Sequence, residues 1–166
     1  MKTETNGHEP KPQKITPFIT YNNSAEEAMN FYTSVFKNSK IIGMNRIQVP
    51  GMDKPLVTGT IELEGQKVML LDGGPHFKFT EGFSLFVNCE TQEEVDHYWE
   101  KLSEGGSKGN CGWLKDKFGV SWQVIPSALG RLMNDPDRGK SKRVIDAMLQ
   151  MHKIEINKLE AAYENK

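Results

Sequence analysis

The sequence is short of cysteine, of long apolar runs and of charge of one sign. Its two cysteines, Cys89 and Cys111, have no C-x-x-C spacing, which argues against a zinc site and a disulfide framework. The 21 basic and 22 acidic residues give a net charge of −1, which offers no electrostatic support for nucleic-acid binding. No apolar run approaches the roughly 20 residues of a membrane span. We therefore expect a cytoplasmic protein without nucleic-acid or membrane partners.

A nine-residue stretch occurs twice in the chain, at residues 24–32 and 91–99. Each copy opens with Ser or Thr and carries Glu three positions later, which is typical of a capping box at a helix start. Bulky apolar residues follow at helical spacing, and a short β-rich run precedes each copy. The repeat predicts a duplicated strand–helix module, whose working surface is expected where the copies meet.

Short stretches rich in glycine, proline and polar residues divide the chain into four segments. Residues 1–14 are polar and predict a disordered leader. Residues 15–72 predict a first βαβββ module, and residues 82–125 predict a second one with an eroded middle strand. Residues 126–166 predict a helical tail, whose apolar residues need cover from the tail's own sheet or from a partner subunit. We expect an α+β fold forming one compact domain overall.

Three stretches, at 28–32, 82–85 and 112–124, carry a resemblance to a known family. Together with the duplicated βαβββ order, they make the chain similar to the vicinal oxygen chelate superfamily of glyoxalases, extradiol dioxygenases and bleomycin-resistance proteins. Within it, the chain resembles the PhnB-like branch, often labelled 3-demethylubiquinone-9 3-methyltransferase. The resemblance covers residues 15–125. It implies a curved mixed sheet around a cleft, and a homodimer in which modules pair within one chain or between subunits.

The resemblance also implies a test for a metal ion. Metal-dependent relatives use four side chains, typically His, Glu or Gln, one from the first and one from the fourth strand of each module. Strand alternation places these positions at Pro17, Met69, Gly82 and Gln123. Only Gln123 is a suitable ligand for a hard divalent ion. We therefore predict no metal and no other cofactor, with a divalent metal as the alternative.

The same alternation predicts the residues that line the cleft. They form a mostly apolar surface with a few polar groups, which suits a small aromatic or aliphatic ligand held by few hydrogen bonds. A face that is simply filled core is the alternative. The predicted lining residues are Ile19, Tyr21, Met69, Leu71, Ser84, Phe86, Trp113, Ser121 and Gln123.

The predicted function is therefore small-molecule binding on a glyoxalase-like scaffold. One alternative is a lyase, isomerase or dioxygenase with a displaced metal site around His76, Asp72 and Gln123, where His76 with a nearby carboxylate acts as general base. Another is an interaction module whose tail binds a partner. Methyl transfer fits poorly, because a βαβββ order gives no parallel Rossmann-like sheet.

Overall fold

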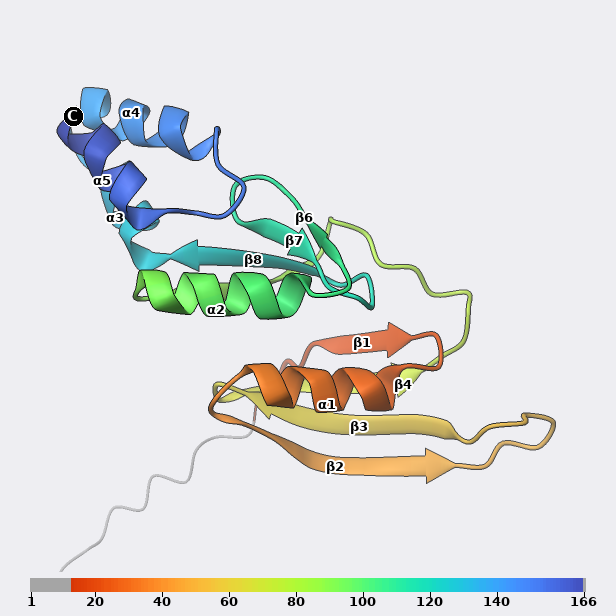
Figure 1. The fold of residues 1–166 in the computed structure, drawn as a ribbon. Helices are drawn as coiled ribbons and strands as arrows, with labels where there is room; N and C mark the ends of the chain where they lie inside the picture. The colour runs from red at the N-terminus through yellow and green to blue at the C-terminus, as the bar shows by residue number, and fades with distance from the viewer. Residues whose placement is uncertain (1–12, 166) are drawn as a thin grey trace, which may run out of the picture. The chain divides into compact units, whose positions relative to one another are not determined.

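The computed structural model describes residues 13–165, so the predicted leader lies almost wholly outside the described residues. The chain divides into two compact units, with the boundary between His76 and Phe77. Each unit contains a four-stranded mixed sheet with a helix on one face (Figure 1). This confirms the α+β class, the two βαβββ modules and the helical tail. The joining of the two units into one compact domain stays a prediction.

The first unit contains β1 (Phe18–Tyr21), α1 (Ala25–Val35), β2 (Ser39–Ile47), β3 (Leu56–Leu63) and β4 (Gln66–Asp72). The strand order is β1-β4-β3-β2. β1 runs parallel to β4, and the other pairs are antiparallel. β1 lies at an edge of the sheet, as Pro17 predicts, because proline cannot donate to a central ladder.

The core of the first unit lies between α1 and one face of its sheet. Strand β3 alternates strictly, so its odd-numbered positions face the helix. Gly59 is one of these positions, and a Cβ there would lie 2.5 Å from the Met29 sulfur and 2.8 Å from the Gly43 carbonyl oxygen. Glycine at this point lets α1 approach the sheet closely. The helix buries Ala25, Ala28, Met29, Tyr32 and Val35.

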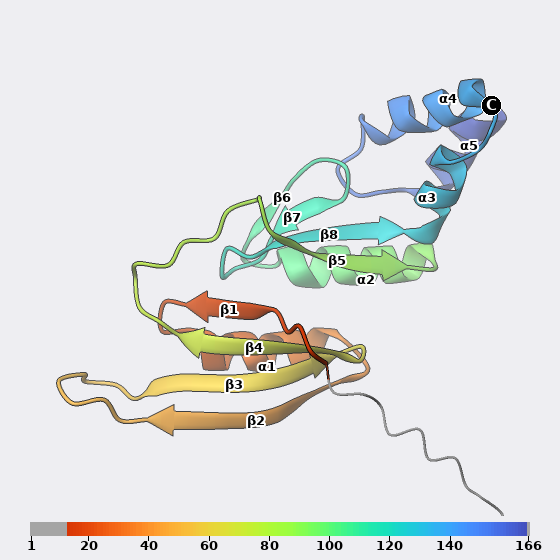
Figure 2. The same cartoon turned by 180° about the vertical axis from the view of Figure 1, so that it is seen from behind.

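The second unit repeats this order with shorter strands. It contains β5 (Ser84–Cys89), α2 (Gln92–Ser103), β6 (Ser107–Lys108), β7 (Trp113–Lys115) and β8 (Ser121–Pro126). The strand order is β5-β8-β7-β6, with β5 parallel to β8 (Figure 2). The two-residue β6 is the eroded middle strand expected from the Gly- and Ser-rich sequence around it.

Only one of the two predicted capping boxes is formed. Thr91 accepts a hydrogen bond from the Glu94 backbone N–H at 3.3 Å, which caps α2. At the start of α1, the Ser24 side chain makes no capping bond, so that part of the prediction is wrong. The carboxylate of Asp72, at the end of β4, instead accepts from the Ala25 N–H at 2.8 Å.

The tail forms α3 (Ser127–Met133), α4 (Arg138–Met148) and α5 (Ile156–Glu164), gathered at one end of the second unit (Figure 1). Its apolar side chains form a small core, with Ile125 of β8 packed against it. The Gln92 side chain of α2 bonds to the Ile154 carbonyl at 3.1 Å and to the Ile156 N–H at 2.8 Å. The tail therefore covers its own unit, which was one of the two sequence-based alternatives. The buried residues of this core are Leu129, Leu132, Val144, Met151, Ile154 and Leu159.

Among the described residues, no helix combines the length and the apolar content needed to cross a membrane.

Candidate functional site

The side of each sheet that faces away from its helix is called here the open face. On the second sheet, strand register arranges the open face in rows that cross the strands. One row joins Ser84 of β5, Ser121 of β8 and Lys115 of β7. The next row joins Phe86, Gln123 and Trp113 on the same strands. Five of the predicted lining residues therefore share this face: Ser84, Phe86, Trp113, Ser121 and Gln123.

These residues combine exposed aromatic surface with hydrogen-bonding groups. The Phe86 side chain is 58% exposed although it lies within a strand. Beside it, the Gln123 side-chain amide donates to the Ser84 hydroxyl at 2.9 Å. Ser121 is only 2% exposed, and its hydroxyl oxygen has no hydrogen-bond partner. The arrangement suits an organic ligand with one flat apolar part and a few polar atoms.

On the first sheet, the predicted face of β1 is wrong by one residue. Ile19 is 5% exposed and Tyr21 is 1% exposed, because both point toward α1. The Tyr21 hydroxyl lies 3.1 Å from the hydroxyl of Tyr32 on that helix. Both residues therefore belong to the core rather than to a ligand surface.

The register with β4 identifies the open face of β1. Phe18 pairs with Met69, and Thr20 pairs with Leu71. Met69 and Leu71 thus lie on the open face as predicted, whereas Phe18 and Thr20 were missed. One face of β1 carries Ile19 and Tyr21, and the other carries Phe18 and Thr20. Because both faces have a large apolar side chain, alternation alone did not show which face points toward the helix. Phe18 is 52% exposed.

Asp72 and His76 do not form the expected base and carboxylate pair. Asp72 is buried on the helix side of β4, where it caps α1 through the Ala25 N–H. His76 is exposed at the end of the first unit. Gln123, the third member of the displaced ligand set, belongs to the second unit. The geometry within each unit therefore does not support a metal site or a general base at these residues.

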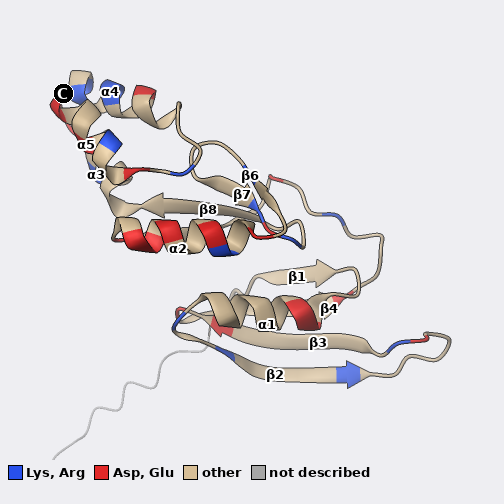
Figure 3. Cartoon of the chain, in the orientation of Figure 1, with Lys and Arg blue, Asp and Glu red and all other residues tan. Residues whose placement is uncertain are grey.

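The corrected register also weakens the case for a metal ion at the family's positions. The open faces of β1, β4, β5 and β8 carry no His, Asp or Glu, and β1 and β8 carry no charged residue at all (Figure 3). Over residues 13–165, no three His, Cys, Asp or Glu side chains come together as a possible metal site. One glutamine among hydroxyl and apolar groups is not a donor set for a divalent ion.

Cys89 lies just before α2 but is not an activated thiol. Burial raises its pKa to about 12, and the charges of Glu94 and Glu90 act in the same direction. These effects outweigh any lowering by the helix N-terminus. Cys89 is therefore a structural core residue.

Comparison with known proteins identifies the family. The family described as 3-demethylubiquinone-9 3-methyltransferase matches residues 13–125. A PhnB protein from Bacillus cereus is 40% identical, with a TM-score of 0.65, over 69% of this chain and 100% of that one. No curated protein matches the chain.

More distant structures share only the fold. Protein PA1353 from Pseudomonas aeruginosa is 22% identical, with a TM-score of 0.61, over 69% of this chain and 97% of that one. The fosfomycin resistance protein FosX from Listeria monocytogenes, in complex with Mn(II) and sulfate, is 14% identical, with a TM-score of 0.51, over 67% of this chain and 88% of that one. The chain belongs to the family described as 3-demethylubiquinone-9 3-methyltransferase, which includes the PhnB protein, and it shares its fold with FosX.

Proposed function

We propose that the protein binds a small organic molecule on the open face of its second sheet, without a resident metal ion. The observation that carries this proposal is the row of Phe86, Gln123 and Trp113, with Ser84 hydrogen-bonded to Gln123 at 2.9 Å. A surface of this composition can hold a ligand by apolar contact and orient it with a few polar groups.

The chemistry of the row defines the class of ligand. The face of the exposed Phe86 ring offers stacking to a flat or aliphatic group. The Gln123 amide donates to Ser84, so its carbonyl oxygen can accept from a ligand, while the Ser84 hydroxyl can donate to one. We infer a small ring compound with one polar substituent.

The two enzymatic alternatives have less support. A displaced metal site would need Asp72, whose carboxylate caps α1. Methyl transfer, which the family description names, would need a glycine-rich loop after a strand of a doubly wound parallel sheet. Each of the two sheets has only one parallel pair of strands, β1 with β4 and β5 with β8.

Benzyl alcohol, benzamide and benzoate test the proposal, because they share a ring and differ in the polar group. We expect each to change the tryptophan fluorescence saturably and to raise the melting temperature. Gln123→Ala should weaken benzamide binding about 5- to 10-fold, the equivalent of one hydrogen bond of about 1–1.4 kcal/mol. Gln48→Ala, an exposed loop glutamine bonded to the Met52 carbonyl, is the matched control.

The proposal fails if none of the three ring compounds binds saturably. It also fails if elemental analysis of the purified protein finds a stoichiometric divalent metal. A second test for a metal compares the melting temperature in Mn²⁺, Ni²⁺, Zn²⁺ or Fe²⁺ with the melting temperature in EDTA.

We also propose a homodimer and a cytoplasmic location. The open face of the first sheet exposes Phe18, and edge strand β2 exposes Ile42 and Ile47, which are large apolar side chains that a subunit contact would cover. Light scattering at micromolar concentration should give twice the chain mass of 18.8 kDa. A particle of single-chain mass would contradict the dimer.

A further inference from the structure

The segment of residues 77–83, which leads into β5, is called here the strap. It belongs to the second unit and ends next to Ser84, the first residue of β5. The Glu81 carboxylate of the strap forms an ion pair with the ammonium group of Lys115, the last residue of β7. This contact connects the strap to a strand that is not the neighbour of β5.

The register shows what this ion pair crosses. Ser84 and Lys115 flank Ser121 on either side, in one row of the open face. Two strand spacings separate β5 from β7, a distance of about 10 Å. The ion pair therefore links the strap, which leads into β5, with β7, and β8 lies between these two strands. The strap also approaches the turn before β8, since the Phe79 ring lies 3.6 Å from where a Cβ on Gly119 would be.

Ser121, which lies between Ser84 and Lys115 in this row, is unusual among the described polar groups. It is 2% exposed, and its hydroxyl oxygen is buried without a hydrogen-bond partner. Buried polar side chains nearly always have a partner, so an unpaired hydroxyl requires an explanation. A hydroxyl that bonds to a ligand, and loses its partner when the ligand is absent, provides one.

We propose that Lys115 and Ser121 form an anion subsite, and that the Glu81 carboxylate pairs with its Lys115 side, but not with Ser121, while the strap is closed. A ligand carboxylate takes the place of Glu81 at the Lys115 ammonium and accepts a hydrogen bond from the Ser121 hydroxyl. This inference rests on the proposed function, because it adds the charge of the ligand to the same face. The ligand class becomes a small ring or aliphatic carboxylate.

The charges in this region are consistent with such an exchange. The hydrogen bond from Lys115 is the main cause that lowers the pKa of Glu81, so its carboxylate is ionised at neutral pH. The side chains of Glu81 and Lys115 are 64% and 42% exposed. An ion pair this accessible to water opens at little cost, whereas a buried pair would hold the strap shut.

The experiment compares benzoate with benzamide on Glu81→Gln. Removing the internal carboxylate should tighten benzoate binding about 2- to 5-fold, the typical strength of an exposed ion pair, and leave benzamide binding unchanged. The wild type should bind benzoate more tightly than benzamide, and Lys115→Met should abolish this difference. Ser121→Ala should weaken benzoate binding and keep the fold, since it only removes an unpaired hydroxyl.

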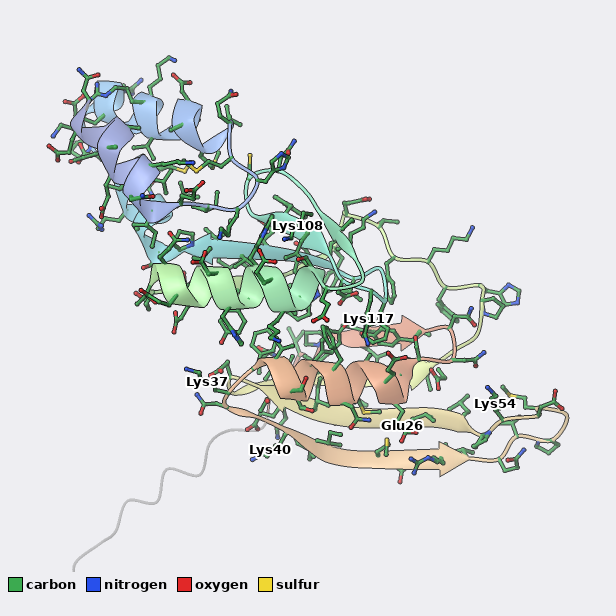
Figure 4. The ribbon with its side chains drawn as sticks, in the orientation of Figure 1. Glu26, Lys37, Lys40, Lys54, Lys108 and Lys117 are labelled. Atoms are coloured by element: carbon green, nitrogen blue, oxygen red, sulfur yellow. The ribbon has the colours of Figure 1, made fainter. Side chains whose placement is uncertain are left out.

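Glu100→Gln is the matched control. Glu100 pairs with Lys108 of β6 at 2.8 Å, also on the surface of the second unit, and Figure 4 labels Lys108. This variant changes the net charge equally but should leave benzoate binding as in the wild type.

The outcomes separate the two proposals. If Glu81→Gln leaves the affinities for benzoate and for benzamide at their wild-type values, the anion subsite is refuted and the small-molecule function stands. If Glu100→Gln tightens benzoate binding as much as Glu81→Gln does, net charge explains the effect and the subsite is refuted. If benzoate, benzamide and benzyl alcohol all fail to bind the wild type and every variant, both proposals fall.

Discussion

Replacing Asp72 should destabilise the first unit, because this residue caps α1 from a different strand. Its carboxylate accepts from the Ala25 N–H at 2.8 Å. Ala25 is fully buried, and Asp72 is only 9% exposed. In Asp72→Ala the N–H loses its acceptor in a place that water reaches poorly. Asp72→Asn keeps an oxygen in the same position and should restore most of the stability.

The size of the effect follows from these contacts. Loss of a capping side chain costs about 0.5–2 kcal/mol, and a buried donor left unpaired costs about 1–3 kcal/mol. Burial at both ends of this bond places the expected loss near 2 kcal/mol, or a fall of roughly 4–8 °C in melting temperature. Ser24→Ala should cost less than about 0.5 kcal/mol, since the Ser24 side chain makes no capping bond.

Urea unfolding followed by far-UV circular dichroism measures these differences. The capping argument is refuted if Ser24→Ala is as destabilising as Asp72→Ala, or if Asp72→Ala leaves the unfolding midpoint unchanged. Asp72→Asn separates the cap from a catalytic base, because an amide can accept the hydrogen bond but cannot take a proton.

Three further predictions concern the second unit. At pH 8 a thiol reagent should label one cysteine per native chain and two per unfolded chain, because the raised pKa of about 12 keeps the buried Cys89 protonated; two native equivalents would contradict this. The indole N–H of Trp122 donates to the Asp116 carboxylate at 2.8 Å, and phenylalanine has no such donor. Trp122→Phe should therefore lower the free energy of unfolding in urea by about 2 kcal/mol. A loss below about 0.5 kcal/mol would contradict this reasoning. The hydrogen bond from Lys153 is the main cause that lowers the pKa of Asp96. The stabilisation is therefore complete above the usual value of 3.8, begins to decline below it, and is lost as the pH falls through the lowered pKa of the folded state. Melting temperatures between pH 3 and 7 should therefore fall less steeply in Asp96→Asn, and an unchanged slope would refute the link.

Much of the fold can be predicted from the sequence, because a helix or strand that buries one face repeats its apolar residues at a regular spacing. The apolar stripe of α1 and the alternation of β3 predict both elements within a residue or two of their observed ends. In the tail, apolar spacing predicts a helix only from Lys142, whereas α4 begins four positions earlier, at Arg138, because its first turn is polar. That turn is fixed by the Asp137 carboxylate, which accepts from the Gly139 N–H at 2.8 Å.

The candidate site was predictable only where strand pairing could be inferred. Ser84, Phe86 and Gln123 were assigned to one face because their strands alternate clearly. Ile19 and Tyr21 were misplaced because the face of a short edge strand depends on its partner, which local sequence does not identify. The link between Glu81 and Lys115 joins positions 34 residues apart in the chain, and no local pattern signals such a contact.

The tail limits the length of the proposed binding face. Ile125 of β8, paired with Asn88 of β5, would form a third row of the open face beyond Phe86 and Gln123. The tail core packs against Ile125, so the β8 side of this row is covered, whereas Asn88 on β5 stays exposed. The family match ends at residue 125, before the tail begins. On the proposed binding face, the tail therefore removes apolar surface of β8 that the family-matched part of the chain alone would leave open.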